Sequence, residues 1–136
     1  MQNSTPGAIF IPGNVPSSKN NKRAFKVRSK KTGKDKLIVL GSKLSMGWSA
    51  STETAWREKR NSFLKLLEGK EKPYRIVFHF VRDSRRKFDY INPAQTIQDA
   101  MVKHCWLFDD NADELVPSFL PYTYDKESPG VYIHVL

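Results

Sequence analysis

The chain has 136 residues, of which 39% are hydrophobic, and a formal net charge of +9. This length supports one compact core and is too short for two domains. The surplus of Lys and Arg makes nucleic acid the leading charged partner. Cys105 is the only cysteine, which excludes an intrachain disulfide and a multi-cysteine zinc site, and we expect it to be a buried, small apolar residue.

The sequence indicates no association with membranes. No apolar run approaches the length that spans a bilayer, and Met1-Gln2-Asn3-Ser4 lacks the basic and apolar regions of a signal peptide. A single cysteine is also typical of proteins in a reducing compartment. These features predict a cytoplasmic protein.

The N-terminal third alternates short strands with a basic loop. A strand is expected at 8–11 and another at 37–40, and the basic loop between them covers 12–36. Its residues Lys19, Lys22 and Arg23 are candidates for DNA contacts. A solvated surface loop explains the same charge run equally well, because the run carries no base-reading information.

A helix and a central strand follow. Ser51 or Thr52 can cap a helix that continues to about Leu67, where Gly69 stops it. The segment 74–81 alternates aromatic and aliphatic residues, which predicts a strand at the centre of the sheet. His79 falls on its second face, where a packed histidine is more common than a ligand.

The remaining elements complete an α+β single domain with a mixed sheet flanked by two helices. Asn92 followed by Pro93 predicts the start of a helix that runs to about His104. The segment 106–108 is expected to begin the next strand. Two further strands are expected within 115–124 and 131–136, with a hairpin turn at 126–130.

Acidic residues are concentrated in the segment 85–114, which contains the aspartates Asp89, Asp99, Asp109, Asp110 and Asp113. Carboxylates on a basic chain suggest a hard divalent cation held against a polyanion. A helix that packs back on the sheet returns the chain near its start, so we expect Asp89 to meet Asp109 and Asp110. The preceding cations Arg85, Arg86 and Lys87 would contact phosphate.

Such a group of carboxylates can hold Mg²⁺, with Mn²⁺ as a substitute, and leave positions for water and a phosphate oxygen. The metal would then polarise a phosphodiester and help generate hydroxide. Composition alone also allows a plainer interpretation. Asp109-Asp110-Asn111 is good turn sequence, and Asp99 can be an ordinary residue on a helix surface.

A family resemblance favours the first interpretation. Asp89 followed by Asn92, then Asp99-Ala100, then Trp106-Leu107-Phe108-Asp109-Asp110 resembles the signature of RusA-like Holliday junction resolvases, which are crossover junction endodeoxyribonucleases. The opening segments Ile11-Pro12-Gly13 and Ser18-Lys19-Asn20 also resemble that family. The resemblance covers most of the chain, and its diagnostic part lies within 85–110. It implies the RusA fold, Mg²⁺-dependent cleavage of four-way DNA junctions, and a homodimer.

The resemblance assigns roles to individual residues. Asp89 and Asp110 match essential carboxylates, with Asp109 beside them, and Asn92 and Asp99 support the site. Asp113 is a candidate for the third metal ligand, as are Asp109 and the side-chain oxygen of Asn92, although a helix cap is the preferred role of Asn92.

Two positions depart from the family pattern. Ile91 replaces its second acidic residue and Gln95 replaces its lysine. These departures favour an alternative, a catalytically impaired protein that binds branched DNA without cutting it. A third hypothesis is another Mg²⁺-dependent nuclease that acts on flaps or RNA, because the metal chemistry does not identify the substrate.

Overall fold

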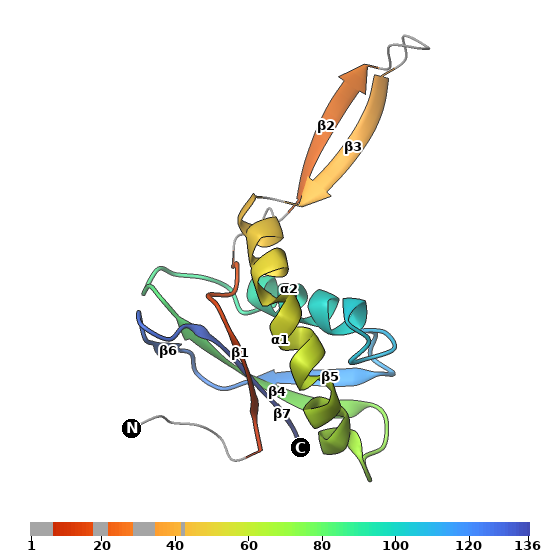
Figure 1. Cartoon of the computed structure of the whole chain (residues 1–136), viewed down its shortest axis with the longest axis vertical. Coiled ribbons are helices and arrows are strands. Elements are labelled where there is room, and N and C mark those ends of the chain that lie inside the picture. The colour runs from red at the N-terminus through yellow and green to blue at the C-terminus, as the bar shows by residue number, and fades with distance from the viewer. Residues whose placement is uncertain (1–6, 18–21, 29–34, 42) are drawn as a thin grey trace.

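The computed structural model describes residues 7–17, 22–28, 35–41 and 43–136, with the backbone alone for 22–28, 35–41 and 43–46. Within these residues lie a five-stranded mixed sheet, a separate two-stranded hairpin and two helices (Figure 1). The strands of the large sheet are β1 (Ile9–Pro12), β4 (Tyr74–Arg82), β5 (Leu115–Phe119), β6 (Thr123–Tyr124) and β7 (Gly130–Val135). The hairpin consists of β2 (Lys22–Arg28) and β3 (Asp35–Gly41), and the helices are α1 (Lys43–Leu67) and α2 (Ile91–Lys103). The predicted α+β class is confirmed.

Strand β4 lies at the centre of the large sheet, as predicted. The order is β1-β7-β4-β5, and the short strand β6 also pairs with β4. Strand β7 is antiparallel to β1 and β4, whereas β5 runs parallel to β4. Tyr74 pairs with Leu115, the first residue of each parallel strand. Both strands therefore begin at the same edge of the sheet, and α2 connects the end of β4 with the start of β5.

One face of the sheet and both helices share a single hydrophobic core. Ile76, Phe78 and Phe80 alternate along β4 and are buried in it. The core also contains Trp56 of α1 and Ile97 of α2. Because side chains of both helices join the same cluster, the two helices cover the same face of the sheet. The burial of these apolar side chains supplies the main favourable contribution to folding.

The opposite face of β4 carries His79, which is packed as predicted. Its Nε2 lies 3.1 Å from Thr123 Oγ1, and its ring stacks on Tyr132 with 5.6 Å between the centroids. Burial lowers the pKa of His79 from its ordinary value, because the charged imidazolium would lose hydration. The neutral ring is therefore favoured at this position.

The structure places the start of each helix at a different residue from the one predicted from the sequence. Helix α1 begins eight or nine residues earlier, at Lys43. The hydroxyls of Ser51 and Thr52 donate to the carbonyl of Trp48 at 3.0 and 2.9 Å. Such bonds to the preceding turn satisfy the hydroxyl inside a helix, so neither residue caps one. Helix α2 begins at Ile91 and has no side-chain cap, so the predicted cap at Asn92 is wrong.

The predicted strand at 106–108 is also wrong. Trp106 is buried, and its Nε1 donates to the carbonyl of Trp56 at 2.9 Å, which anchors the chain after α2 against α1. Cys105 has a φ of 61°, and this left-handed conformation reverses the chain where the helix ends. Cys105 is exposed rather than buried. The predicted strand within 115–124 is divided into β5 and β6.

The basic segment 12–36 contains β2 and the start of β3 rather than loop alone. The two strands pair antiparallel from Lys22 opposite Gly41 to Arg28 opposite Asp35. Figure 1 shows this hairpin projecting away from the large sheet. Among the described residues, no helix is both long and apolar enough to cross a bilayer.

Gly130 and Gly47 provide a matched pair of substitutions. A Cβ at Gly130 would collide with the main-chain oxygen of Ile11 and would lie 2.5 Å from the ring of Phe10, whereas a Cβ at Gly47 meets no atom within 4 Å. We expect Gly130→Ala to lower the free energy of unfolding by about 1–3 kcal/mol through overpacking. Gly47→Ala in α1 should raise it by about 0.5–1 kcal/mol, because alanine favours a helix interior. Urea denaturation measures both values, and equal effects would contradict the β1–β7 pairing.

Candidate functional site

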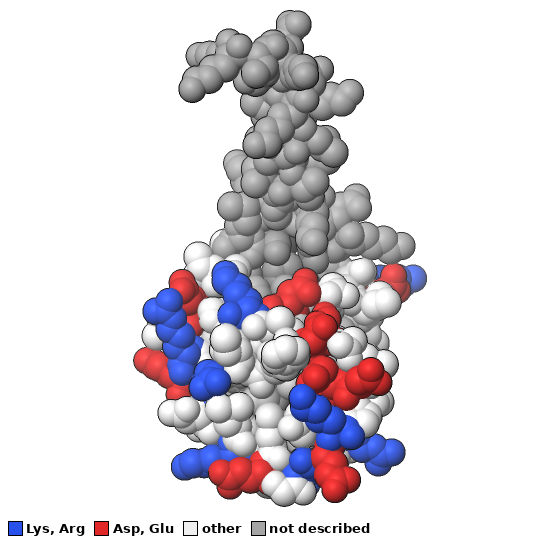
Figure 2. All heavy atoms as spheres, turned by 90° about the vertical axis from the view of Figure 1, so that its right-hand side faces the viewer, with Lys and Arg blue, Asp and Glu red and all other residues white. Residues whose placement is uncertain are grey.

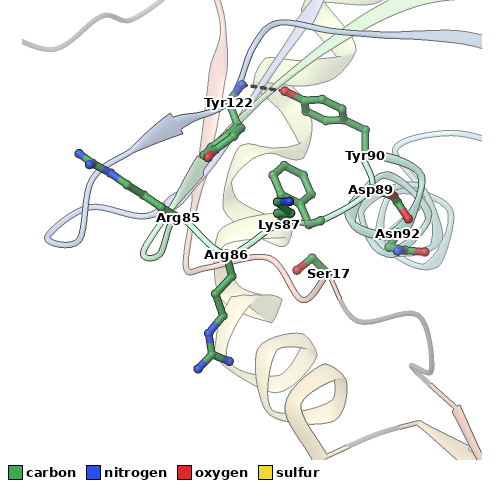
Figure 3. A pocket seen from close by; sticks show the side chains of 9 residues that line it. Ser17, Arg85, Arg86, Lys87, Asp89, Tyr90, Asn92 and Tyr122 are labelled. Carbon is green, nitrogen blue, oxygen red and sulfur yellow. Dashed lines mark hydrogen bonds between the residues drawn. The ribbon is translucent and has the colours of Figure 1, made fainter.

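An open pocket of about 540 Å³ lies beside the loop 83–90, which leaves the end of β4 (Figure 3). Residues from three parts of the chain form its walls: the segment after β1, the loop itself with the start of α2, and the segment before β6. They are Ser17, Arg85, Arg86, Lys87, Phe88, Asp89, Tyr90, Asn92 and Tyr122. Volumes of this size accommodate small molecules or a nucleotide-sized group.

Arg82 holds the wall of this pocket together. It is the last residue of β4 and is only 7% exposed. Its Nη1 donates to the carbonyl of Arg86 at 2.7 Å, and its Nη2 donates to Ser17 Oγ at 2.9 Å. Its guanidinium also lies 3.9 Å from the ring centroid of Phe88. One buried side chain therefore connects the loop after β4 with the segment after β1.

Three aromatic rings form the apolar part of the wall. Phe88 packs edge-on against Tyr90 and Tyr122, with 5.1 Å between the centroids in each pair. The amide of Tyr122 donates to the hydroxyl of Tyr90 at 2.9 Å. Tyr90 also stacks on Phe119 at the end of β5, with 5.3 Å between the centroids. These contacts attach the loop to the sheet.

The charges at the pocket are mainly positive. Arg85, Arg86 and Lys87 contribute three cations, and Asp89 contributes the one carboxylate among the described lining residues. Arg82 adds a fourth cation behind the wall. Burial lowers the pKa of the Arg82 guanidinium, which nevertheless remains protonated at neutral pH. This arrangement favours a bound anion such as a phosphate.

The polar side chains that line the pocket point in different directions. In Figure 3, Arg85 and Arg86 extend outward from the rim, whereas Asp89 and Asn92 lie together at the start of α2. The guanidinium of Arg85 lies 4.6 Å from the ring centroid of Tyr124. The cations can therefore reach a long anionic chain that passes over the rim, with the carboxylate of Asp89 beside it.

Asp109, Asp110 and Asp113 lie in a turn before β5. Asp109 accepts hydrogen bonds from the amide of Asp110 at 2.8 Å and from Asn111 Nδ2 at 3.0 Å. These bonds lower the pKa of Asp109, the bond from the Asp110 amide most of all. The amide of Asp113 donates to Asn111 Oδ1 at 2.9 Å. The plainer interpretation, that this segment is turn sequence, describes its local structure correctly.

The structure does not bring Asp89 together with Asp110 and Asp113. Asp89 immediately precedes the first turn of α2, whereas the acidic turn follows its end, and the 13 residues of the helix rise about 20 Å. The expectation failed because β5 is parallel to β4, so the chain must travel back along the sheet before β5 begins. Among the described residues, no three Asp, Glu, His or Cys side chains are grouped to hold a metal ion. A three-carboxylate metal site is therefore absent from that part of a single chain.

The predicted supporting residues occupy separate places. Asn92 lines the pocket, and its main-chain N–H donates to the main-chain carbonyl of Asp89 at 3.1 Å. Asp99 is exposed on α2 and accepts a hydrogen bond from Gln95 Nε2 at 2.8 Å. Ile91, which replaces an acidic residue of the resembled family, is 73% exposed.

The candidate DNA-binding residues fall into two groups. Lys22 and Arg23 belong to β2 in the projecting hairpin, and Lys19 lies outside the described residues. Arg85, Arg86 and Lys87 line the pocket. The two groups belong to different elements, so a bound polyanion would have to contact both the hairpin and the pocket.

Sequence reasoning missed Arg82 and the aromatic wall. Arg82 follows Ile76, Phe78 and Phe80 at two-residue spacing, so the alternation of the strand already directs it toward the core. A charged residue in that series signals a buried polar contact. No comparable signal in the sequence indicates that Tyr122 belongs to the pocket, because Tyr90 and Tyr122 meet only in the tertiary structure.

Comparison of the chain with protein-family models and with curated proteins gives no match. The resemblance to RusA-like resolvases therefore depends on the quoted motifs.

Arg82→Lys tests the assigned role of the buried guanidinium. Lysine cannot bridge two acceptors with a planar fork, so the loop should loosen and the free energy of unfolding should fall by about 1–3 kcal/mol. Arg57→Lys is the matched control, because Arg57 is exposed and forms an i,i+4 ion pair with Glu53 on the surface of α1, so a change below about 0.5 kcal/mol is expected. Chemical denaturation measures both variants. Equal stability of the two would show that Arg82 does not organise the pocket.

Proposed function

We propose that this protein binds branched DNA, four-way junctions above all, and cleaves it as an Mg²⁺-dependent endonuclease of the RusA-like type. The observation that carries the proposal is the position of Asp89, an exposed carboxylate in a pocket with Arg85, Arg86 and Lys87. Cations that bind phosphate beside a carboxylate are the combination that phosphodiester cleavage requires. A cytoplasmic location is part of the proposal and is supported by the single cysteine.

Two further features support DNA as the polyanion. The net charge of +9 favours electrostatic association with phosphates. The hairpin strand β2 has the sequence KRAFKVR, and it belongs to an element that projects from the large sheet. A two-stranded ribbon of this kind fits the major groove of B-DNA. The hairpin and the pocket would then contact separate parts of one branched molecule.

The chain's own residues have definite roles in this proposal. Arg85 and Arg86 hold phosphates at the rim, and Lys87 neutralises charge near the scissile group. Tyr90 and Tyr122 exclude water from one side of the pocket. Mg²⁺ would polarise the phosphodiester and lower the pKa of a bound water. Asp89 fits as one ligand, since Mg²⁺ commonly uses one or two carboxylates together with substrate phosphates.

A second candidate is a branched-DNA-binding protein that does not cleave. Ile91 offers no ligand atom, and the amide of Gln95 is engaged by Asp99 rather than directed at a phosphate. In this case the pocket would bind a phosphate without activating it. The two candidates share the DNA contacts and differ only in chemistry.

Neutralising the pocket cations tests the DNA contacts. We expect the triple variant Arg85→Gln, Arg86→Gln, Lys87→Gln to weaken binding to a labelled four-way junction and to reduce the slope of log K against log salt by up to about 3. The control neutralises Arg57, Lys65 and Lys70, three exposed cations outside the pocket, with the same change in net charge. Electrophoretic mobility shifts at several salt concentrations provide the measurement. Equal slopes for both triple variants would refute a specific role of the pocket.

Asp89→Asn tests the chemistry. It should reduce Mg²⁺-dependent nicking of a four-way junction by more than about 100-fold and leave junction binding unchanged or tighter, because a negative charge facing phosphate is removed. Duplex and flap DNA are the controls for substrate choice. Symmetric nicks by the natural protein support the resolvase, and a junction that is retarded but intact supports the second candidate. Nicking that is unaffected by Asp89→Asn would exclude the assigned site.

A further inference from the structure

The three aromatic rings of the pocket wall have different surroundings. Tyr90 stacks on Phe119, and its hydroxyl accepts the hydrogen bond from the amide of Tyr122, so this ring holds the loop against the sheet. Phe88 and Tyr122 are half-buried and line the pocket. Their rings meet at 79° with 5.1 Å between the centroids. These two rings therefore form an apolar corner in the wall, which we call the aromatic corner.

Arg82 supports the aromatic corner from behind. Its guanidinium lies 3.9 Å from the ring centroid of Phe88 and 6.0 Å from that of Tyr122. A cation in such a contact covers one face of an aromatic ring. Phe88 nevertheless lines the pocket, so part of its ring is directed away from Arg82 and toward the cavity. A second flat group can therefore stack in the aromatic corner.

Polar groups of the pocket can contact the edge of such a flat group. In Figure 3, Asp89 and Asn92 lie on the other side of Lys87 from Tyr122. The side-chain amide of Asn92 both donates and accepts hydrogen bonds, and the carboxylate of Asp89 accepts them. The cations of the rim suit phosphates. The pocket of about 540 Å³ thus combines surfaces for the face of a base, for its edge and for its phosphates.

We propose that this pocket takes one unpaired nucleotide, with its base in the aromatic corner and its phosphates on the cations of the rim. Neighbouring bases cover both faces of a base inside a duplex, so only a nucleotide that has left the stack can enter. Leaving the stack costs least for a mispaired or unpaired base. The inference rests on the proposed function, because the branch point of a junction, where helices end, is where such a nucleotide is expected.

A second exposed ring lies at a less suitable place. Phe108 is 87% exposed, but it directly precedes Asp109 and Asp110. Figure 2 shows acidic side chains gathered on the side of the molecule that faces right in Figure 1, the side toward which α2 runs. Negative charge repels a nucleic acid. Phe108 is therefore the matched control for an exposed ring outside the pocket.

Two DNA duplexes test the capture of a base without metal or a junction. One duplex carries a single unpaired nucleotide, and the other carries an abasic nucleotide at the same position, so both have the same number of phosphates. The natural protein should bind the first more tightly by about 5- to 50-fold, because bases stack favourably on aromatic side chains. Fluorescence anisotropy measures both dissociation constants. Equal affinity for the two duplexes would overturn the proposal.

Variants place the captured base in the pocket. Phe88→Leu and Tyr122→Leu each remove a ring and keep an apolar side chain, so each should abolish most of the preference for the unpaired base. The salt dependence of binding should not change, because no charge is altered. Tyr122→Phe keeps the ring and should restore the preference, and Phe108→Leu should retain it. A preference that survives both leucine variants in the pocket, or is lost in Phe108→Leu, would refute the assigned position.

Four-way junctions separate this inference from the proposed nuclease. A junction with a mispaired base at its branch point should bind more tightly than a fully paired one, because less pairing is lost, and Tyr122→Leu should not distinguish the two. Equal affinity of the natural protein for both junctions would reject capture at the branch point. Base-dependent binding by a protein that leaves junctions uncut supports the nucleotide pocket and rejects the cleavage. Cleavage by a protein that binds both test duplexes equally supports the nuclease and rejects the nucleotide pocket.

Discussion

The parallel pairing of β4 with β5 is the constraint on which the arrangement of the candidate site depends. Parallel neighbours require a crossover connection, and here α2 provides it. The loop 83–90 consequently lies at the end of β4, while the turn 109–113 lies beside its beginning, where the amide of Tyr74 donates to the carbonyl of Glu114 at 2.8 Å. The polar residues of the segment 85–114 are divided between two edges of the sheet.

Arg82 organises the edge of the sheet at which β4 ends and the pocket lies. Burying a guanidinium is costly unless its donors find acceptors. The carbonyl of Arg86 and the hydroxyl of Ser17 offset that cost, and the ring of Phe88 covers one face of the cation. The charge remains, and it adds to the cations that line the pocket. Part of the chain's surplus of positive charge is thus concentrated at the pocket, where it gives a positive electrostatic potential.

Several parts of the fold were predictable because they depend on neighbours in the sequence. The alternation of Ile76, Phe78 and Phe80 identifies the central strand. Helix starts were less predictable. Ser51 and Thr52 have typical capping side chains, but their hydroxyls bond within a longer helix that packs Trp48 and Trp56 into the core. Tertiary packing outweighed the local capping preference there.

The sequence by itself determined the fold class, the central strand and the identity of the cations that line the pocket, because periodicity and charge are local properties. The tertiary structure alone decided which of these residues meet. It joined Ser17 to Arg82 and Tyr90 to Tyr122, and it separated Asp89 from Asp110. Whether two segments share an edge of a sheet depends on strand direction and register. Those are set by long-range pairing and core packing, which no local pattern of aspartates encodes.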